Sequence, residues 1–156
     1  MRIILWLVLG LFVLVSVPLT GVEYLEQLGL GVHAGHMSSS GYSIRSFQDK
    51  LGIQGTIGAY ATKHESSFNL GICGIAVLDE FERGRLYLIA GGSFRAFSDK
   101  EDDNEEHNRW TLGIGPGVEL ILGRNVRFTA ELPITLNWKK YIVMWIPMAG
   151  LYYYFK

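Results

Sequence analysis

The longest regular alternation of apolar and polar residues runs from Arg109 to Trp138. Counted in twos, its first half places these apolar residues on one face: Trp110, Leu112, Ile114, Pro116, Val118, Leu120 and Leu122. After Gly123–Asn125 the pattern restarts with Val126, Phe128, Ala130, Leu132, Ile134, Leu136 and Trp138. A period of two predicts two antiparallel strands joined by a tight turn. Each strand would be longer than the usual five or six residues.

Similar alternation recurs along the rest of the chain and predicts a single domain of eight strands. The other predicted strands lie at 28–36, 42–48, 51–62, 68–78, 85–97 and 141–155. The second is the least regular, because Ile44 and Phe47 fall out of phase. The connections at 49–50, 79–84 and 123–125 are predicted at one end. Those at 37–41, 63–67, 98–108 and 139–140 are predicted outside, at the other end.

The apolar faces have two structural interpretations. A soluble sandwich or a lipocalin-like barrel buries them, whereas a transmembrane barrel turns them toward lipid. The opposite faces are rich in glycine and carry few charges, which favours a narrow lumen over a water-exposed surface. Strands of about ten residues fit a tilted bilayer span, and eight is the smallest number in bacterial single-chain barrels. The sequence therefore predicts an all-β, eight-stranded, antiparallel, up-and-down transmembrane β-barrel.

The composition agrees with a chain of many strands and argues against nucleic-acid-binding, disulfide-linked and cysteine–zinc proteins. There are 19 glycines, eight phenylalanines, eight tyrosines and four tryptophans, and the formal net charge is -1. That charge gives no basic surface for nucleic acid. The lone Cys73 excludes an intramolecular disulfide and a cysteine-based zinc site. Residues 1–21 combine Arg2 with an apolar run of signal-peptide length, so we expect a cleaved export signal before a barrel domain at 22–156, with an uncleaved anchor as the alternative.

From about Gly29 to Phe155 the chain resembles the small outer-membrane β-barrel proteins of the porin-like, OmpX/OmpA-barrel type. The resemblance lies in the alternation of apolar residues with small or polar residues at 51–60, 86–92, 112–119 and 128–131, and in the aromatic C-terminus. Such barrels carry a C-terminal sorting motif of a glycine followed by spaced aromatics, which Gly150, Tyr153 and Phe155 match. Lys156 departs from the motif, since an aromatic residue usually comes last. The resemblance implies an architecture and a location in the bacterial outer membrane, and no reaction.

Charged residues on the glycine-rich faces are the candidate site. Glu119, Arg127 and Glu131 fall on lumen faces of neighbouring strands, and Arg95 is expected to join them. Centring the turn on Arg124 pairs Glu119 with Thr129, which makes Arg127 and Glu131 diagonal neighbours of Glu119. We therefore predict an ion-pair network in which Arg127, with Arg95, bridges the two carboxylates. A proton or ion path along these residues is the alternative.

Catalysis would require a histidine near a serine and a carboxylate at the outer rim. His33 and His36 precede Ser38–Ser40, but no motif of the lipid-modifying barrel enzymes appears. We therefore expect no enzyme and no catalytic residue, with a rim hydrolase or acyltransferase as the alternative. His33 and His36 fall on opposite faces of a strand, and the acidic stretch 99–106 lacks the spacing of a calcium loop, so no metal site or cofactor is expected. Weak binding of divalent cations among surface lipids is the alternative for the acidic stretch.

The expected role is structural, or an interaction made through external loops, by a monomer with a plugged and non-conducting lumen. Its expected partners are outer-membrane lipids, the barrel-assembly machinery, and an envelope or extracellular partner at the charged loop 98–108. No nucleic-acid partner is expected. The lipocalin-like alternative would bind a small apolar ligand.

Overall fold

A computed structural model describes residues 28–61, 65–99, 107–137 and 142–155 of the chain. The predicted export signal at 1–21, most of the charged loop, and the turn at Lys139–Lys140 lie outside these residues. The strands are β1 (Leu28–Ala34), β2 (Gly41–Gln48), β3 (Leu51–Ala61), β4 (Glu65–Phe81), β5 (Gly84–Asp99), β6 (His107–Ile121), β7 (Val126–Glu131), β8 (Ile134–Asn137), β9 (Ile142–Trp145) and β10 (Met148–Tyr154). Among the described residues, no helix is long and apolar enough to cross a membrane.

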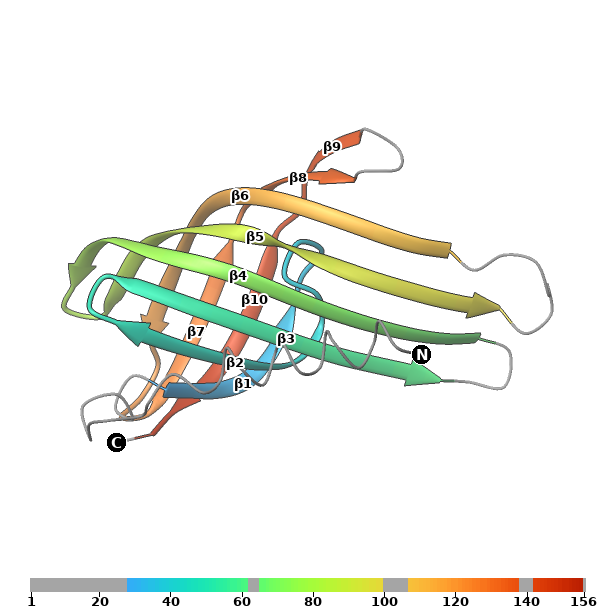
Figure 1. Cartoon of the computed structure of the whole chain (residues 1–156). Coiled ribbons are helices and arrows are strands. Elements are labelled where there is room, and N and C mark those ends of the chain that lie inside the picture. The colour runs from blue at the N-terminus through green and yellow to red at the C-terminus, as the bar shows by residue number, and fades with distance from the viewer. Residues whose placement is uncertain (1–27, 62–64, 100–106, 138–141, 156) are drawn as a thin grey trace.

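Eight of these strands close into an antiparallel barrel (Figure 1). Each is hydrogen-bonded to the next in the order β1, β2, β3, β4, β5, β6, β7, β10, and β10 returns to β1. This confirms the prediction of an all-β, eight-stranded antiparallel barrel. The end that carries the β2–β3, β4–β5 and β6–β7 turns is called the turn end below, and the opposite end is called the loop end.

The barrel wall has unequal height. β4, β5 and β6 contain 17, 16 and 15 residues, whereas β1, β2, β7 and β10 contain only six to eight. The long strands extend past the short ones toward the loop end, as Figure 1 shows. One side of the barrel is therefore a tall sheet and the other is a low wall.

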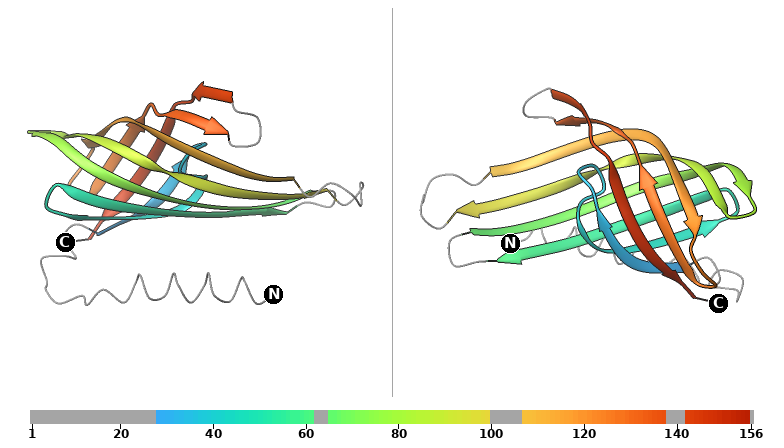
Figure 2. Two further views of the ribbon diagram at one scale, coloured as in Figure 1. Left: turned by 45° about the horizontal axis from the view of Figure 1, so that its top comes forward. Right: turned by 180° about the vertical axis from the view of Figure 1, so that it is seen from behind.

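The two C-terminal segments predicted as single strands are each broken in two, which corrects the sequence analysis. Pro133 separates β7 from β8, and Pro147 separates β9 from β10. Proline has no N–H to donate to a ladder, so it interrupts a paired strand. β6 pairs with β7 over its last residues and with β8 over residues 111–114, while β9 pairs with β8. The β8–β9 hairpin bends away from the ring, as both views in Figure 2 show.

Gly115 allows the close approach at the first of these breaks. A Cβ on Gly115 would lie 2.3 Å from the Cα of Pro133, far inside normal contact. The backbone nevertheless keeps one bond across the break, because the Leu132 N–H donates to the Pro116 carbonyl at 2.9 Å. The break is therefore a packed kink in the wall.

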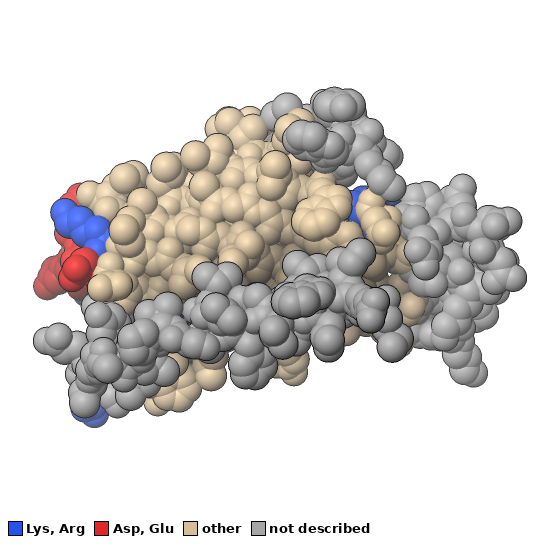
Figure 3. All heavy atoms as spheres, in the orientation of Figure 1, with Lys and Arg blue, Asp and Glu red and all other residues tan. Residues whose placement is uncertain are grey.

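Side chains alternate across the wall as the period of two predicted. On the tall sheet, Ile53, Ile72 and Leu112 point outward and are about half exposed, whereas Gln54, Cys73 and Thr111 are buried in the lumen. The irregular segment 42–48 follows the same rule, with Ile44 exposed and Phe47 buried. On the face drawn in Figure 3, charged side chains gather at the β4–β5 turn, and the described wall beside them is almost uncharged.

Candidate functional site in the barrel lumen

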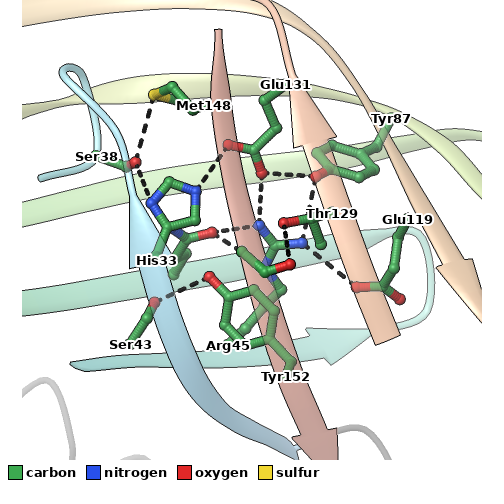
Figure 4. Close-up of polar contacts among 12 residues, drawn as sticks. His33, Ser38, Ser43, Arg45, Tyr87, Glu119, Thr129, Glu131, Met148 and Tyr152 are labelled. Atoms are coloured by element: carbon green, nitrogen blue, oxygen red, sulfur yellow. Dashed lines mark hydrogen bonds and ion pairs between the residues drawn. The ribbon is translucent and has the colours of Figure 1, made fainter. Parts of the chain in front are cut away.

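Arg45, on β2, lies at the centre of the lumen with its side chain fully buried. Its Nε donates to Gln54 on the neighbouring strand at 3.0 Å, and one terminal nitrogen bonds the same amide oxygen. The guanidinium lies over the ring of Tyr152, 4.6 Å from its centroid. The two terminal nitrogens reach across the lumen to carboxylates on the opposite wall (Figure 4).

Glu131, on β7, is the closer carboxylate and is completely enclosed. One oxygen accepts from Arg45 at 2.7 Å and from the Tyr87 hydroxyl at 2.6 Å. Its other oxygen lies 3.1 Å from Nε2 of His33 on β1. Three strands from different parts of the barrel thus converge on one side chain.

Glu119, on β6, is held by two arginines. One oxygen accepts from Arg85 on β5 at 2.8 and 2.5 Å. The other lies 3.3 Å from Arg45 and accepts from the Tyr154 hydroxyl at 2.9 Å. Arg85 also covers the ring of Phe47, 3.7 Å from its centroid. The cluster extends from β2 to β10 and fills the lumen near the turn end.

This cluster follows from the cost of burying charge. A buried ion without a partner is far more expensive than one that is paired and hydrogen-bonded. In the part of the chain that the structure describes, every buried side-chain nitrogen and oxygen has a hydrogen-bond partner. Fully satisfied networks of this kind make a core rigid and specify one arrangement of the strands.

Of the four residues predicted to form the network, Glu119 and Glu131 belong to it, whereas Arg95 and Arg127 lie outside it. The predicted register holds, with Glu119 opposite Thr129 and Ile121 opposite Arg127. Glu119 and Glu131 both carry ion pairs in the lumen, but Arg45 bridges them in place of Arg127. Arg127 is half-buried closer to the turn, where it donates to the Gly123 carbonyl at 3.2 Å and lies over the Tyr154 ring.

Arg95 lies far from the network, at the loop end of the tall sheet. Its guanidinium is 5.7 Å from the Phe97 ring, and Arg109 stands directly opposite it in the strand register. The prediction that Arg95 and Arg127 bridge the carboxylates is therefore wrong. Its error was to consider only neighbouring strands, whereas a narrow lumen lets Arg45 reach across from the opposite wall.

The loop between β1 and β2 enters the lumen, which corrects its predicted external position. Met37, Ser38 and Ser39 are essentially inaccessible to solvent. Ser39 adopts a left-handed backbone with φ of 71° and bonds the Asn69 amide through its hydroxyl. The Ser38 carbonyl packs so closely on β4 that a Cβ at Gly71 would lie 2.1 Å from it. Residues 35–40 are called the plug loop below.

His33 joins the plug loop to the charged network. Its Nδ1 lies 3.0 Å from the Ser38 hydroxyl and 3.3 Å from the Ser39 carbonyl. Its Nε2 faces Glu131, so the imidazole links a serine on one side to a carboxylate on the other (Figure 4). His33 and Ser38 are close in the sequence, but Glu131 lies 98 positions from the histidine and carries no local signal of this contact.

The C-terminal residues divide between the two faces of β10. Gly150 is buried opposite His33, whereas Tyr153 and Phe155 point outward with their rings 5.4 Å apart. No group of three or more potential metal ligands occurs among the described side chains. Comparison of the chain with protein-family models, curated proteins and solved structures gives no match.

Proposed function

We propose that this protein is a bacterial outer-membrane β-barrel with a structural or loop-mediated role in the cell envelope. The observation that carries the proposal is the inverted arrangement of its side chains. Leucine, isoleucine and aromatic side chains cover the outside of the wall, while Arg45, Glu119 and Glu131 are buried within it. A transmembrane barrel has this arrangement, because its outer face meets hydrocarbon and its lumen is polar.

A soluble barrel that binds an apolar ligand requires the opposite arrangement. Its outer face would carry polar side chains and its interior would be apolar. Here Ile53, Ile72, Leu112 and Leu151 are each close to half exposed on the outside. Such a continuous apolar surface on a protein in water would promote association with other apolar surfaces.

The lumen supports a barrel that does not conduct. An eight-stranded barrel has room for side chains and little else. In this chain the turn-end half is filled by the Arg45 cluster, and the plug loop fills the space beside β4. We therefore propose a monomer surrounded by outer-membrane lipid, placed there by the barrel-assembly machinery and directed by Gly150, Tyr153 and Phe155. Envelope or extracellular partners would meet the external loops.

Membrane fractionation and heat-modifiable mobility test this proposal. The full chain, expressed with its N-terminal segment, should enter the outer-membrane fraction and resist extraction by carbonate. Without boiling, it should migrate as a folded species on a detergent gel and shift on heating. Recovery in the soluble fraction would contradict the proposal.

In planar bilayers the refolded protein should give no stable open level, and a reproducible conductance step would contradict the plugged lumen.

A further inference from the structure

Among the described strands, the pairing that closes the barrel wall is interrupted beside the plug loop. The ladder between β1 and β10 ends at Ala34 opposite Ala149, and Pro147 lies two positions further toward the loop end. Beyond that point β9 bonds only to β8, among the described strands. Figure 2, seen from behind, shows the plug loop next to this part of β10.

Ser38 lies directly behind the interruption. Met148, the first residue of β10, places its sulfur 3.5 Å from the Ser38 hydroxyl. Met148 is itself 3% exposed and Ser38 is 1% exposed, so the methionine side chain covers the serine in this conformation. Methionine is unbranched and flexible. Rotation of Met148 would uncover the hydroxyl from the side of the interruption.

The groups around Ser38 match the requirements of an activated serine. Arg45 and Tyr87 hold one oxygen of Glu131, which keeps this carboxylate anionic and fixed, and its other oxygen lies 3.1 Å from Nε2 of His33. An anionic acceptor at Nε2 keeps the proton on that nitrogen, so Nδ1 presents its lone pair to the Ser38 hydroxyl at 3.0 Å. The Ser39 carbonyl, 3.3 Å from Nδ1, would accept a hydrogen bond once Nδ1 is protonated.

We propose that Ser38 and His33 are catalytic residues of an acyl-ester hydrolase, and that Glu131 is the positioning residue. The substrate class is a lipid ester whose acyl chain enters through the interruption beside Met148. The inference rests on the proposed membrane location and adds an activity to it. It departs from the expectation, drawn from sequence alone, that the chain is not an enzyme.

The reaction balances with water as the only co-reactant. The Ser38 oxygen attacks the ester carbonyl carbon while its proton moves to Nδ1 of His33. The carbon–oxygen bond to the alcohol then breaks, and the alkoxide takes that proton and leaves as an alcohol. Water attacks the acyl-serine with His33 again as the base, which releases the carboxylic acid and restores the serine.

An alkyl fluorophosphonate probe tests the serine directly, because it forms a stable phosphorus–oxygen bond with an activated serine and releases fluoride. The refolded full chain in detergent should gain one adduct, located on Ser38 by peptide mass spectrometry. Ser38→Ala should abolish labelling, and His33→Gln should slow it at least about a hundredfold. Met148→Ala should accelerate it. Ser40→Ala is the matched control, because its hydroxyl bonds only the Gly35 backbone, and its rate should equal that of the parent chain.

Glu131→Gln separates positioning from a merely structural role. Loss of the carboxylate removes the group that orients the imidazole, so labelling of Ser38 should slow in protein that keeps its heat-modifiable mobility, and Glu131→Asp should restore part of the rate. If the parent chain and Met148→Ala are both heat-modifiable and both remain unlabelled, the inference is wrong. Labelling at another serine also overturns it. Labelling at Ser38 in a protein that remains soluble would contradict the membrane location and leave the activated serine standing.

Discussion

The turn end and the loop end of this barrel fill the lumen in different ways. At the turn end, each of the eight strands is hydrogen-bonded to two neighbours, and the lumen is filled by charges that satisfy one another. At the loop end, the β8–β9 hairpin has left the ring, and the lumen is filled by the plug loop. Most of the charged network therefore lies where the ring is closed, with Glu131 at the last residue of β7 next to the break. Beyond it, the plug loop makes mainly hydroxyl-rich contacts and meets the network through His33.

The difference has a physical reason. Buried ions require partners in fixed positions, and only a fully paired wall holds strands at fixed separations. A serine-rich loop needs less support, because each hydroxyl can rotate to bond a nearby backbone or side-chain group. The comparison predicts that the two halves differ in their sensitivity to substitution.

The largest expected effect is at Arg45. Arg45→Met would leave Glu131 and Glu119 without their shared cation and should lower the free energy of unfolding by about 3–5 kcal/mol. Arg127→Met is the matched control on the same lumen face, where the guanidinium bonds one exposed carbonyl, and it should cost less than about 1 kcal/mol. Urea titrations of the folded protein in lipid vesicles would measure both. Equal losses would show that Arg45 does not organise the lumen.

A second contrast lies on the outer face of β4. Ile72 is near the middle of this strand and Leu78 is near its turn end, and both are exposed. Ile72→Arg should lower the free energy of unfolding by about 2–4 kcal/mol if it meets the hydrocarbon centre, whereas Leu78→Arg should cost about 0–1 kcal/mol near the interface. Urea titrations in lipid vesicles would measure both losses of stability. A larger loss for Leu78→Arg than for Ile72→Arg would contradict the proposed position of β4 in the bilayer.

The smallest effect concerns the free edge of the hairpin. Amides of β9 that are not bonded to β8 should exchange with deuterium at least about tenfold faster than those of β10 between Ala149 and Tyr154, which are paired on both sides. Exchange followed by mass spectrometry in detergent would resolve the two peptides. Equal protection would mean that the edge of β9 is covered.

Sequence patterning predicted the faces and the register because both depend on local periodicity. The pairing of Glu119 with Thr129 followed from one turn, and the outward position of Ile72 followed from alternation along one strand. Pro133 lies inside a predicted strand, and the continuous alternation around it hides the break that its missing N–H causes. The two breaks were therefore missed.

The site was predictable only in part, because its decisive contacts cross the lumen. Local patterning indicated that Glu119 and Glu131 lie inside, but it carried no information on which distant strand faces them. A signal for Arg45 was present, since Ser43, Arg45 and Phe47 alternate with Tyr42 and Ile44. Reading that segment as a regular strand would have placed Arg45 in the lumen.

The central claim is that the apolar outer face meets lipid, and site-directed spin labelling tests it most directly. Nitroxides placed singly at each position from 68 to 75 of β4, in protein reconstituted into vesicles, should be measured with a lipid-soluble and a water-soluble quencher. The account predicts that the lipid-soluble quencher reaches positions 68, 70, 72 and 74 and spares the positions between them. Absence of this two-residue period, or preferential access of the water-soluble quencher to the four outward positions, would contradict a membrane-spanning barrel.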